Sequence, residues 1–278
     1  MLSLFSLIDG EQLFLKNIAG DGPFEIRNPA RLQITDNRID IINRSGKIIS
    51  FDFEGNELFE AQTNLQFVKD FYMIDDQVLA TTDSPANSYL TYLFNAENYS
   101  MEPIKIPQRI ENLLMAPFNE SGTITSYGNY IYVAEPHGSK VHQLDKNSIE
   151  VVKSIELIIP NFKVISADNP LNAYFDNMDL LNDFLSQNSM ITTIDRINNN
   201  FLMEVFHAHQ NFSGRELLIL DDYLTVLCIM DFSDDLFGVQ NPKIHAVAND
   251  LIYFYREEVD ASSLDVSVIL SAFSAKCK

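Results

Sequence analysis

Basic residues are scarce in this sequence. Its 19 lysines and arginines face 39 aspartates and glutamates, which gives a formal net charge of −20 at pH 7. So acidic a surface repels phosphate backbones and anionic lipid headgroups, which disfavours nucleic-acid binding and peripheral membrane binding. The charge balance suits a cationic or neutral partner, and we predict no nucleic-acid partner.

Cysteines and long apolar runs are also scarce. Two cysteines, Cys228 and Cys277, are too few for a disulfide framework. No apolar stretch approaches the ~20 residues of a membrane-spanning helix, so we predict no integral membrane segment. Residues 1–9 reach an acid without a preceding basic region, unlike a signal peptide. We therefore expect a cytoplasmic protein, or a periplasmic or cell-surface protein whose export signal lies upstream of this sequence.

Common catalytic motifs are missing as well. There is no G-x-S-x-G elbow, and no pairing of a cysteine with a histidine can be argued from the sequence. The glycines of Gly20-Asp21-Gly22 precede a proline and a predicted strand, without the lysine or helix that would hold a phosphate. We expect a structural turn there, and we predict no catalytic residue.

The sequence is rich in short strands. Hydrophobic residues make up 46% and charged residues 21%, as in an ordinary globular protein. Residues 49–53 alternate apolar and polar side chains, which predicts a strand with one solvated face. Tyr130–Val133, Phe201–Phe206 and Leu251–Tyr255 are apolar on both faces, so strands there need cover on both sides.

The strands recur with a period. An apolar residue followed by Asp or Asn and a turn occurs at Asp9, Asp52, Asn95, Asp145 and Asp221, at spacings of 43, 43, 50 and 76 residues. Repeats of about 40–50 residues with four short strands are typical of β-propeller blades, and stacked blades cover both faces of a strand. The sequence therefore predicts an all-β propeller of four-stranded blades.

The repeat also predicts the boundaries of the blades. Four complete blades are expected at residues 28–65, 66–106, 107–158 and 159–231, with a fifth blade starting near 232. The longest spacing leaves room for a short helical insertion near 176–186, where Met178, Leu181 and Leu185 stand at helical spacing.

We expect residues 1–278 to form a single domain whose ring is closed by strands from both ends of the chain. Residues 11–18 have the length and character of a strand, and they would complete the fifth blade beside residues 267–273. This closure would remove exposed strand edges. The strand expected at residues 4–8 does not fit this closure, and we interpret it as a possible remnant of a further blade.

Residues 20–55 resemble a known family. The turn Gly20–Ile26, the strand Arg38–Ile42 and the hairpin Lys47–Gly55 are similar to those of six-bladed β-propellers of the TolB-like and NHL-like type, found in Bacteroidetes-type bacteria. The resemblance implies six blades, and it implies an export or lipoprotein signal, which such proteins often carry. The family has no common established activity. Its members usually have glycine at the position of Phe24, which puts the geometry of this turn in question.

Two of the histidines are candidate metal ligands. His207 and His209 lie on one face of a predicted strand and form half of a possible metal site. No third ligand can be located from the sequence. We therefore expect a solvated strand end, with no metal and no cofactor.

Two functions are compatible with these observations. The first is a non-catalytic binding propeller, whose loops at one mouth of the channel hold a protein, peptide or glycan. The alternative is a metal-dependent hydrolase or lyase, because some propellers related to the NHL class hold calcium or zinc in the central channel. Its candidate ligands near predicted inner strands are Asn129, Glu135, Glu204, His207 and Asn249.

The closure of the ring is testable. Deleting residues 1–18 is expected to bare a strand edge and promote association between copies of the chain. Size-exclusion chromatography with light scattering, together with a thermal melt, would detect this. A monomeric variant with unchanged stability would contradict the closure.

Overall fold

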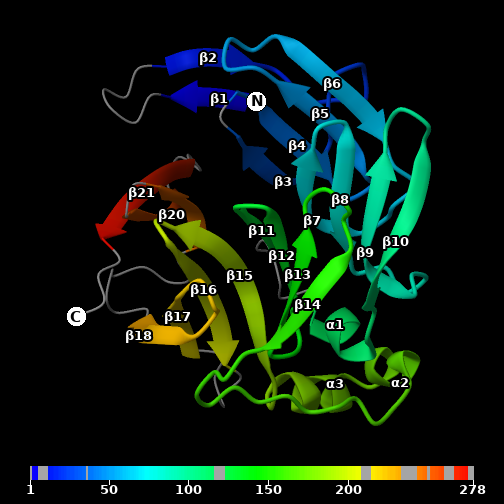
Figure 1. Ribbon diagram of the computed structural model, residues 1–278, viewed down its shortest axis with the longest axis vertical. Coiled ribbons are helices and arrows are strands. Elements are labelled where there is room, and N and C mark those ends of the chain that lie inside the picture. The colour runs from blue at the N-terminus through cyan, green and yellow to red at the C-terminus, as the bar shows by residue number, and fades with distance from the viewer. Residues whose placement is uncertain are drawn as a thin grey trace. The chain divides into compact units, whose positions relative to one another are not determined.

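The structure, a computed structural model, describes residues 2–5, 12–35, 37–115, 123–207, 214–232, 243–248, 251–259 and 266–274 (Figure 1). The chain divides into two compact units, residues 1–109 and residues 110–278. The expectation of a single closed domain stays a prediction.

The first unit contains one strand pair and two four-stranded antiparallel sheets. In each sheet the strands follow one another in chain order, so short turns join neighbours. The pair consists of β1 (Leu2–Phe5) and β2 (Gln12–Lys16). The first sheet comprises β3 (Pro29–Ile34), β4 (Ile39–Asn43), β5 (Lys47–Phe51) and β6 (Glu57–Gln62). The second comprises β7 (Val68–Ile74), β8 (Gln77–Thr82), β9 (Tyr89–Asn95) and β10 (Ser100–Pro107).

In its described residues, the second unit contains three more sheets and three short helices. The helices are α1 (Ile110–Met115), α2 (Leu171–Asp176) and α3 (Met178–Leu185). One four-stranded sheet comprises β11 (Ile124–Tyr127), β12 (Tyr130–Ala134), β13 (Lys140–Asp145) and β14 (Val151–Glu156). The next comprises β15 (Ser189–Ile197), β16 (Asn200–His207), β17 (Gly214–Leu220) and β18 (Val226–Phe232). A three-stranded sheet follows, with β19 (Lys243–Ala248), β20 (Leu251–Val259) and β21 (Val266–Ser274).

The sheets follow one another as propeller blades do. Within the first unit, β3 contacts β7; within the second, β11 contacts β15 and β15 contacts β19. The first strand of each sheet therefore lies beside the first strand of the next, as the inner strands of neighbouring blades do. The all-β fold is confirmed, and the four four-stranded sheets lie close to the predicted blade boundaries. The three runs predicted to be apolar on both faces form β12, β16 and β20, which are the second strands of their sheets.

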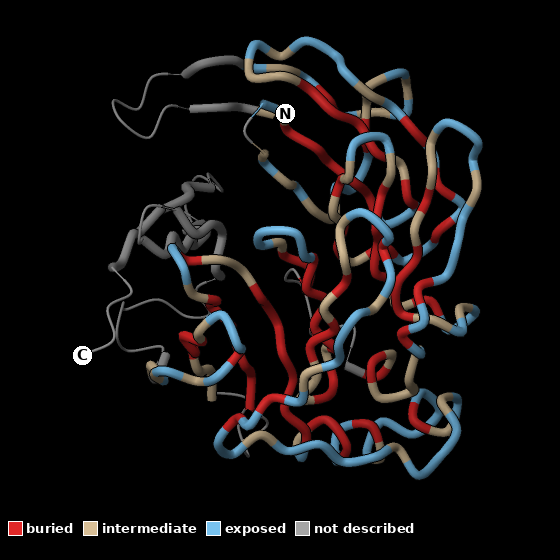
Figure 2. The backbone as a smooth tube through the Cα atoms, in the orientation of Figure 1, coloured by how far each residue is buried: buried red, intermediate tan, exposed pale blue. Residues whose placement is uncertain are grey.

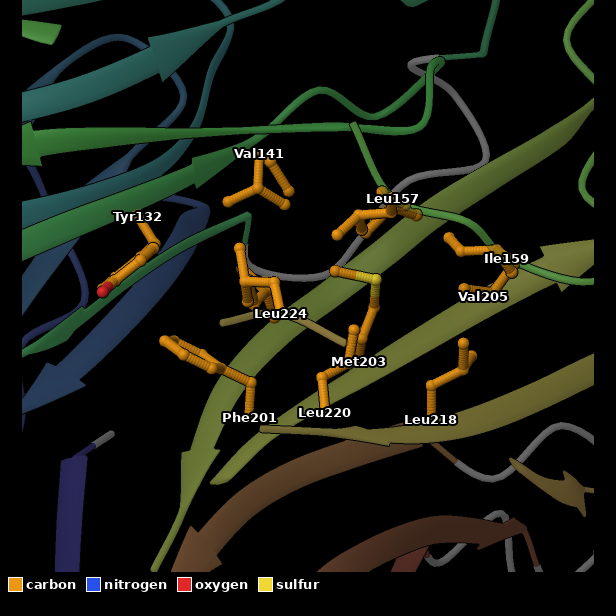
Figure 3. Close-up of a cluster of buried hydrophobic side chains, with 13 residues drawn as sticks. Tyr132, Val141, Leu157, Ile159, Phe201, Met203, Val205, Leu218, Leu220 and Leu224 are labelled. Carbon is orange, nitrogen blue, oxygen red and sulfur yellow. The ribbon is translucent and has the colours of Figure 1, made fainter. Parts of the chain in front are cut away.

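The core of the second unit lies between its two four-stranded sheets. Figure 3 shows this cluster, in which β16 contributes Phe201, Met203 and Val205. Residues from β12, β13 and β17, and the segment that follows β14, pack against them. The other face of β16 is also buried, and Figure 2 shows most of this strand in red. Burial on both faces explains why this run carries so little polarity.

The helices of the second unit pack on one another at one end of these sheets. Leu181, Phe184 and Leu185 of α3 join Tyr174 of α2 and Leu114 of α1 in one buried cluster. The helix predicted near residues 176–186 is α3. The Asn177 side chain caps its N-terminus by accepting hydrogen bonds from the N–H groups of residues 179 and 180. The six-residue helices α1 and α2 were not predicted, because each is too short for a helical period to be visible.

Phe24 adopts the backbone conformation that glycine favours. Its φ of 51° is left-handed, which costs a residue with a side chain roughly 1–2 kcal/mol. The ring packs against Phe51, with 6.2 Å between the ring centroids, and the Phe24 N–H donates to the Glu60 carboxylate at 3.0 Å. These contacts offset the strain, so phenylalanine stands here in a conformation that suits glycine.

Asp40 is a fully buried carboxylate in the first unit. It stands opposite Ser50 on the neighbouring strand and accepts hydrogen bonds from the Ser50 hydroxyl and from the Arg38 Nε, the latter at 3.0 Å. Burial raises the pKa of Asp40 above its ordinary value of 3.8, although both partners act against this shift. Between 3.8 and the raised pKa, the folded protein keeps a proton that the unfolded chain releases. Lowering the pH through this window therefore stabilises the fold through Asp40.

Replacing Asp40 by Asn should remove this contribution. We expect the free energy of unfolding of the native protein, relative to that of Asp40→Asn, to rise as the pH falls through the raised pKa of Asp40 toward 3.8. Urea denaturation at several pH values measures this difference.

Asp52→Asn is the matched control. A hydrogen bond from the Asn56 side chain lowers the pKa of Asp52, so its stabilisation is lost as the pH falls, and the slope should have the opposite sign. Equal slopes for the two variants would contradict the assignment.

Candidate functional site

Three exposed tyrosines mark the turn end of the two four-stranded sheets in the second unit. Tyr127 and Tyr130 are each 37% exposed and Tyr223 is 80% exposed. They lie at the β11–β12 and β17–β18 turns. The antiparallel order of the strands brings these turns, and the β15–β16 turn, to the same end of their sheets. Figure 2 shows such turns mostly in pale blue, beyond the red interior of the strands.

The β11–β12 turn fixes two of the tyrosines. Tyr127 and Tyr130 are direct partners across the hairpin, so they share one face of the sheet with Tyr132. The two residues between them are Gly128, with a φ of 55°, and Asn129. A left-handed first turn residue matches the twist of a tight hairpin and favours glycine. The Asn129 carbonyl accepts a hydrogen bond of 2.9 Å from the Lys146 N–H, which ties this turn to the β13–β14 turn.

Arg196, near the end of β15, joins the two sheets. Its guanidinium carbon lies 3.5 Å from the centroid of the Tyr127 ring and 4.3 Å from that of Phe201. It also donates to the Asp222 carboxylate and to the Asn198 carbonyl, both at 3.2 Å. Cation–π contacts and an ion pair thus hold an arginine that has little exposed surface.

The β17–β18 turn displays Tyr223. The Asp221 carboxylate accepts hydrogen bonds from the N–H groups of Tyr223 and Thr225, at 2.9 and 2.8 Å. Leu224 follows with a φ of 63°, and its side chain is buried in the core between the sheets. Asp221 before Tyr223 and Leu224 after it therefore hold the turn in place, whereas the Tyr223 side chain is mostly exposed to solvent. We refer to Tyr127, Tyr130, Arg196, Asp222 and Tyr223 as the tyrosine–arginine surface.

Tyr132 lies directly beneath this surface. Its ring meets Phe201 edge-on, with 4.7 Å between centroids, and Figure 3 shows the two rings at the same end of the core cluster. Burial raises the pKa of Tyr132, and the positive charge of Arg196 acts against this rise. The surface therefore rests on packed aromatic rings.

The opposite end of the same sheets holds the predicted metal candidate His207. Its side chain is only 2% exposed, so the expectation of a solvated strand end was wrong. The Nε2 atom lies 2.9 Å from the Glu216 carboxylate and the Nδ1 atom lies 3.1 Å from the Ser189 hydroxyl. Phe162 meets the imidazole edge-on. His209 lies outside the described residues.

Two hydrogen bonds link Ser189 to His207 and His207 to Glu216. The order resembles that of the nucleophile, base and acid in a catalytic triad. Ser189 is 1% exposed, however, and its hydroxyl accepts a hydrogen bond of 3.0 Å from the Lys163 N–H. The Ser189 N–H donates in turn to the Lys163 carbonyl at 2.8 Å. A serine buried in this way holds the segment before α2 against β15, and it is not open to a substrate.

The two glutamates considered for a metal site, Glu135 and Glu204, have partners of their own. Glu135 lies 2.8 Å from the Nε2 atom of His142, and Glu204 binds Thr192 and Arg215. Asn129 is exposed at the turn end, whereas Asn249 lies outside the described residues. Among the residues that the structure describes, no three His, Cys, Asp or Glu side chains come together in a possible metal site.

The first unit has a shallow depression of about 270 Å³. Its lining includes Ile18, Ile26 and Arg27. Arg27 is largely exposed and forms an ion pair of 2.9 Å with Asp21. With one charged side chain, already paired, the depression lacks the converging polar groups of a ligand pocket.

The sequence analysis missed the tyrosine–arginine surface. The sequence contained part of the signal for this surface. Tyrosines that flank a tight turn, as in Tyr127-Gly128-Asn129-Tyr130, lie at the end of their strands, where few other side chains cover them. The contact of Arg196 with Tyr127 had no local signal, because the two residues come from different sheets.

No helix in the described part of the chain is long and apolar enough to cross a membrane.

Comparison with known proteins confirms the β-propeller fold. A family model described as a 6-bladed beta-propeller, DUF5128, matches residues 5–210. No protein of curated function matches the chain.

The solved structures that are similar to this chain include the following two. A candidate exported protein from Bacteroides fragilis has 13% sequence identity and a TM-score of 0.59, over 88% of this chain and 70% of that chain. BamB from Moraxella catarrhalis has 11% identity and a TM-score of 0.43, over 93% of this chain and 63% of that chain. At 13% identity, the similarity to the Bacteroides fragilis structure shows the fold alone.

His207 generates a prediction about stability and metal content. His207→Ala should lower the free energy of unfolding by about 1–3 kcal/mol, because it removes the hydrogen bonds that the imidazole makes with the buried Ser189 hydroxyl and the partly buried Glu216 carboxylate. Urea denaturation measures this loss.

Elemental analysis of the untreated protein should find no stoichiometric zinc or calcium. The same analysis of a His207→Ala/His209→Ala variant is the control. About one equivalent of metal in the native protein and none in the variant would contradict this expectation and favour the metal-dependent enzyme.

Proposed function

Because the protein belongs to the DUF5128 family of six-bladed β-propellers, we propose that it is a non-catalytic binding protein that uses the tyrosine–arginine surface. One observation carries the proposal: at one end of two neighbouring sheets, Arg196 packs on the exposed Tyr127, which is the partner of exposed Tyr130 across its hairpin, and pairs with Asp222, which precedes exposed Tyr223. Tyrosine and arginine are the side chains that most often supply binding energy at protein surfaces.

The rigidity of the surface supports this proposal. Hydrogen bonds to Asp221 and to the Asn129 carbonyl fix the turns, and the ion pair with Asp222 fixes Arg196. A ligand therefore has little conformational entropy to remove, which favours binding by groups already in place. Recognition residues on turns of a rigid scaffold are a common arrangement in binding proteins.

We also propose that the protein acts in the periplasm or at the cell surface, as a relative of the TolB-like and NHL-like propellers. The turn Gly20–Ile26 carries that resemblance, and such proteins often have an export or lipoprotein signal. The similar Bacteroides fragilis structure, a candidate exported protein, is compatible with this location.

The metal-dependent hydrolase or lyase has no observation in its favour. Ser189 and Glu216 take up both ring nitrogens of His207, and Glu204 is bound to Thr192 and Arg215. We therefore do not propose it.

An array of immobilised glycans and peptides tests the binding function. The native protein should bind some of the array, and a Tyr130→Ala/Tyr223→Ala variant should lose at least about tenfold of that signal, because the exposed rings provide the contact area. Fluorescence of the labelled protein measures retention.

Tyr99→Ala is the matched control. Tyr99 is 70% exposed in the β9–β10 turn and lies in the first unit. Its replacement should leave the pattern unchanged. A native protein that binds nothing on the array, or a double variant that binds as the native protein does, would contradict the proposal.

A further inference from the structure

We propose that the ligand of the tyrosine–arginine surface is a neutral carbohydrate chain. This inference rests on the proposed binding function and goes beyond it by naming the ligand class. It follows from three properties of the surface: its open aromatic rings, the amide side chains beside them and its local charge.

Each tyrosine offers a flat apolar ring face and a polar hydroxyl group at its tip. Tyr223 is 80% exposed and Tyr130 is 37% exposed, whereas one face of the Tyr127 ring is covered by Arg196. The C–H face of a pyranose packs on such a ring, and the tyrosine hydroxyl remains free to bind a sugar hydroxyl. Tyr130 and Tyr223 are therefore the stacking residues, and Tyr127 supports Arg196.

Planar amide groups lie in the turns at the same end of the sheets as the rings. The turns of this end carry exposed Asn129, Asn147, Asn198 and Asn199. Each side-chain amide offers two donors and an acceptor in one plane. Neighbouring hydroxyls of a sugar are donors and acceptors at matching positions, so amides recognise them without requiring a charge.

The acids of this surface are already engaged. Asp222 pairs with Arg196, while Asp221 and Asp145 each accept two backbone N–H groups of their own turns. Asp145 and Asp221 keep their charge, but the hydrogen bonds of their own turns occupy their oxygens and leave these less available to pair with a basic peptide. The formal net charge of −20 disfavours an anionic glycan or a nucleic acid. A neutral ligand fits both facts.

The apolar part of the surface is small and aromatic. In the described turns of this end, the exposed large hydrophobic side chains are the three tyrosines, while Ile197 and Leu224 are buried. A stable protein partner typically needs about 800 Å² on each side, with a buried apolar centre. A few rings with amides around them suit a chain of a few sugar units better.

Isothermal titration calorimetry with neutral hexasaccharides tests the proposal. The probes are maltohexaose, cellohexaose, xylohexaose and mannohexaose, and a lysine- and arginine-rich hexapeptide serves as the competing class. At least one hexasaccharide should bind, with a Kd that changes less than about twofold between about 50 and about 500 mM NaCl, because no net charge is neutralised.

The variants separate stacking from general damage. Tyr223→Ala and Tyr130→Ala should each weaken binding about tenfold or more, Tyr223→Phe should keep it within about threefold because the ring remains, and Tyr99→Ala should not change it. Circular dichroism confirms that each variant is folded.

Other outcomes overturn the inference. If no hexasaccharide binds, or if binding survives both alanine variants, the carbohydrate proposal is wrong. If the basic peptide alone binds, is released by salt and loses affinity in the alanine variants, the surface is a binding site for a cationic partner. In that case the proposed function stands and only the ligand class fails.

Discussion

The placement of the Arg196 guanidinium between the rings of Tyr127 and Phe201 fixes the turn end of the second unit. An arginine with so little exposed surface is costly unless its charge is compensated, and here two rings, the Asp222 carboxylate and the Asn198 carbonyl compensate it. Because these groups come from different sheets and turns, none of them can move independently. The exposed tyrosines are therefore positioned by an interaction that is itself largely hidden.

The other end of the same sheets is held by buried polar groups. The Asn188 side chain donates to the Phe184 carbonyl at 2.8 Å and accepts from the Ile165 N–H at 2.6 Å, and its oxygen lies 2.8 Å from the Nε2 atom of His137. Together with the hydrogen bond between Ser189 and His207, these bonds hold helix α3 and the segment between β14 and α2 against the start of β15. An apolar core lies between the two ends (Figure 3). Polar networks thus specify the ends, while hydrophobic burial stabilises the middle.

Sequence reasoning was most successful where the signal is local. The sheet boundaries followed from the repeated apolar–Asp pattern, and α3 followed from apolar residues at helical spacing. It failed for His207, because nothing in the sequence shows that Phe162 and Ser189 cover this strand end. It missed the contact of Arg196 with Tyr127 for the same reason. For Phe24 the sequence raised the question of geometry, and the structure answers it with a left-handed φ that packing against Phe51 supports.

The β17–β18 turn separates the residues that shape it from the residue that it displays. Asp221 and Thr225 close the turn, and Leu224 anchors it in the core, whereas the side chain of Tyr223 is almost entirely in solvent. Substitutions at position 223 thus change the chemistry offered to a ligand at small cost in folding free energy. One scaffold can in this way support many specificities, since the tip of this turn is free to vary while its frame is not.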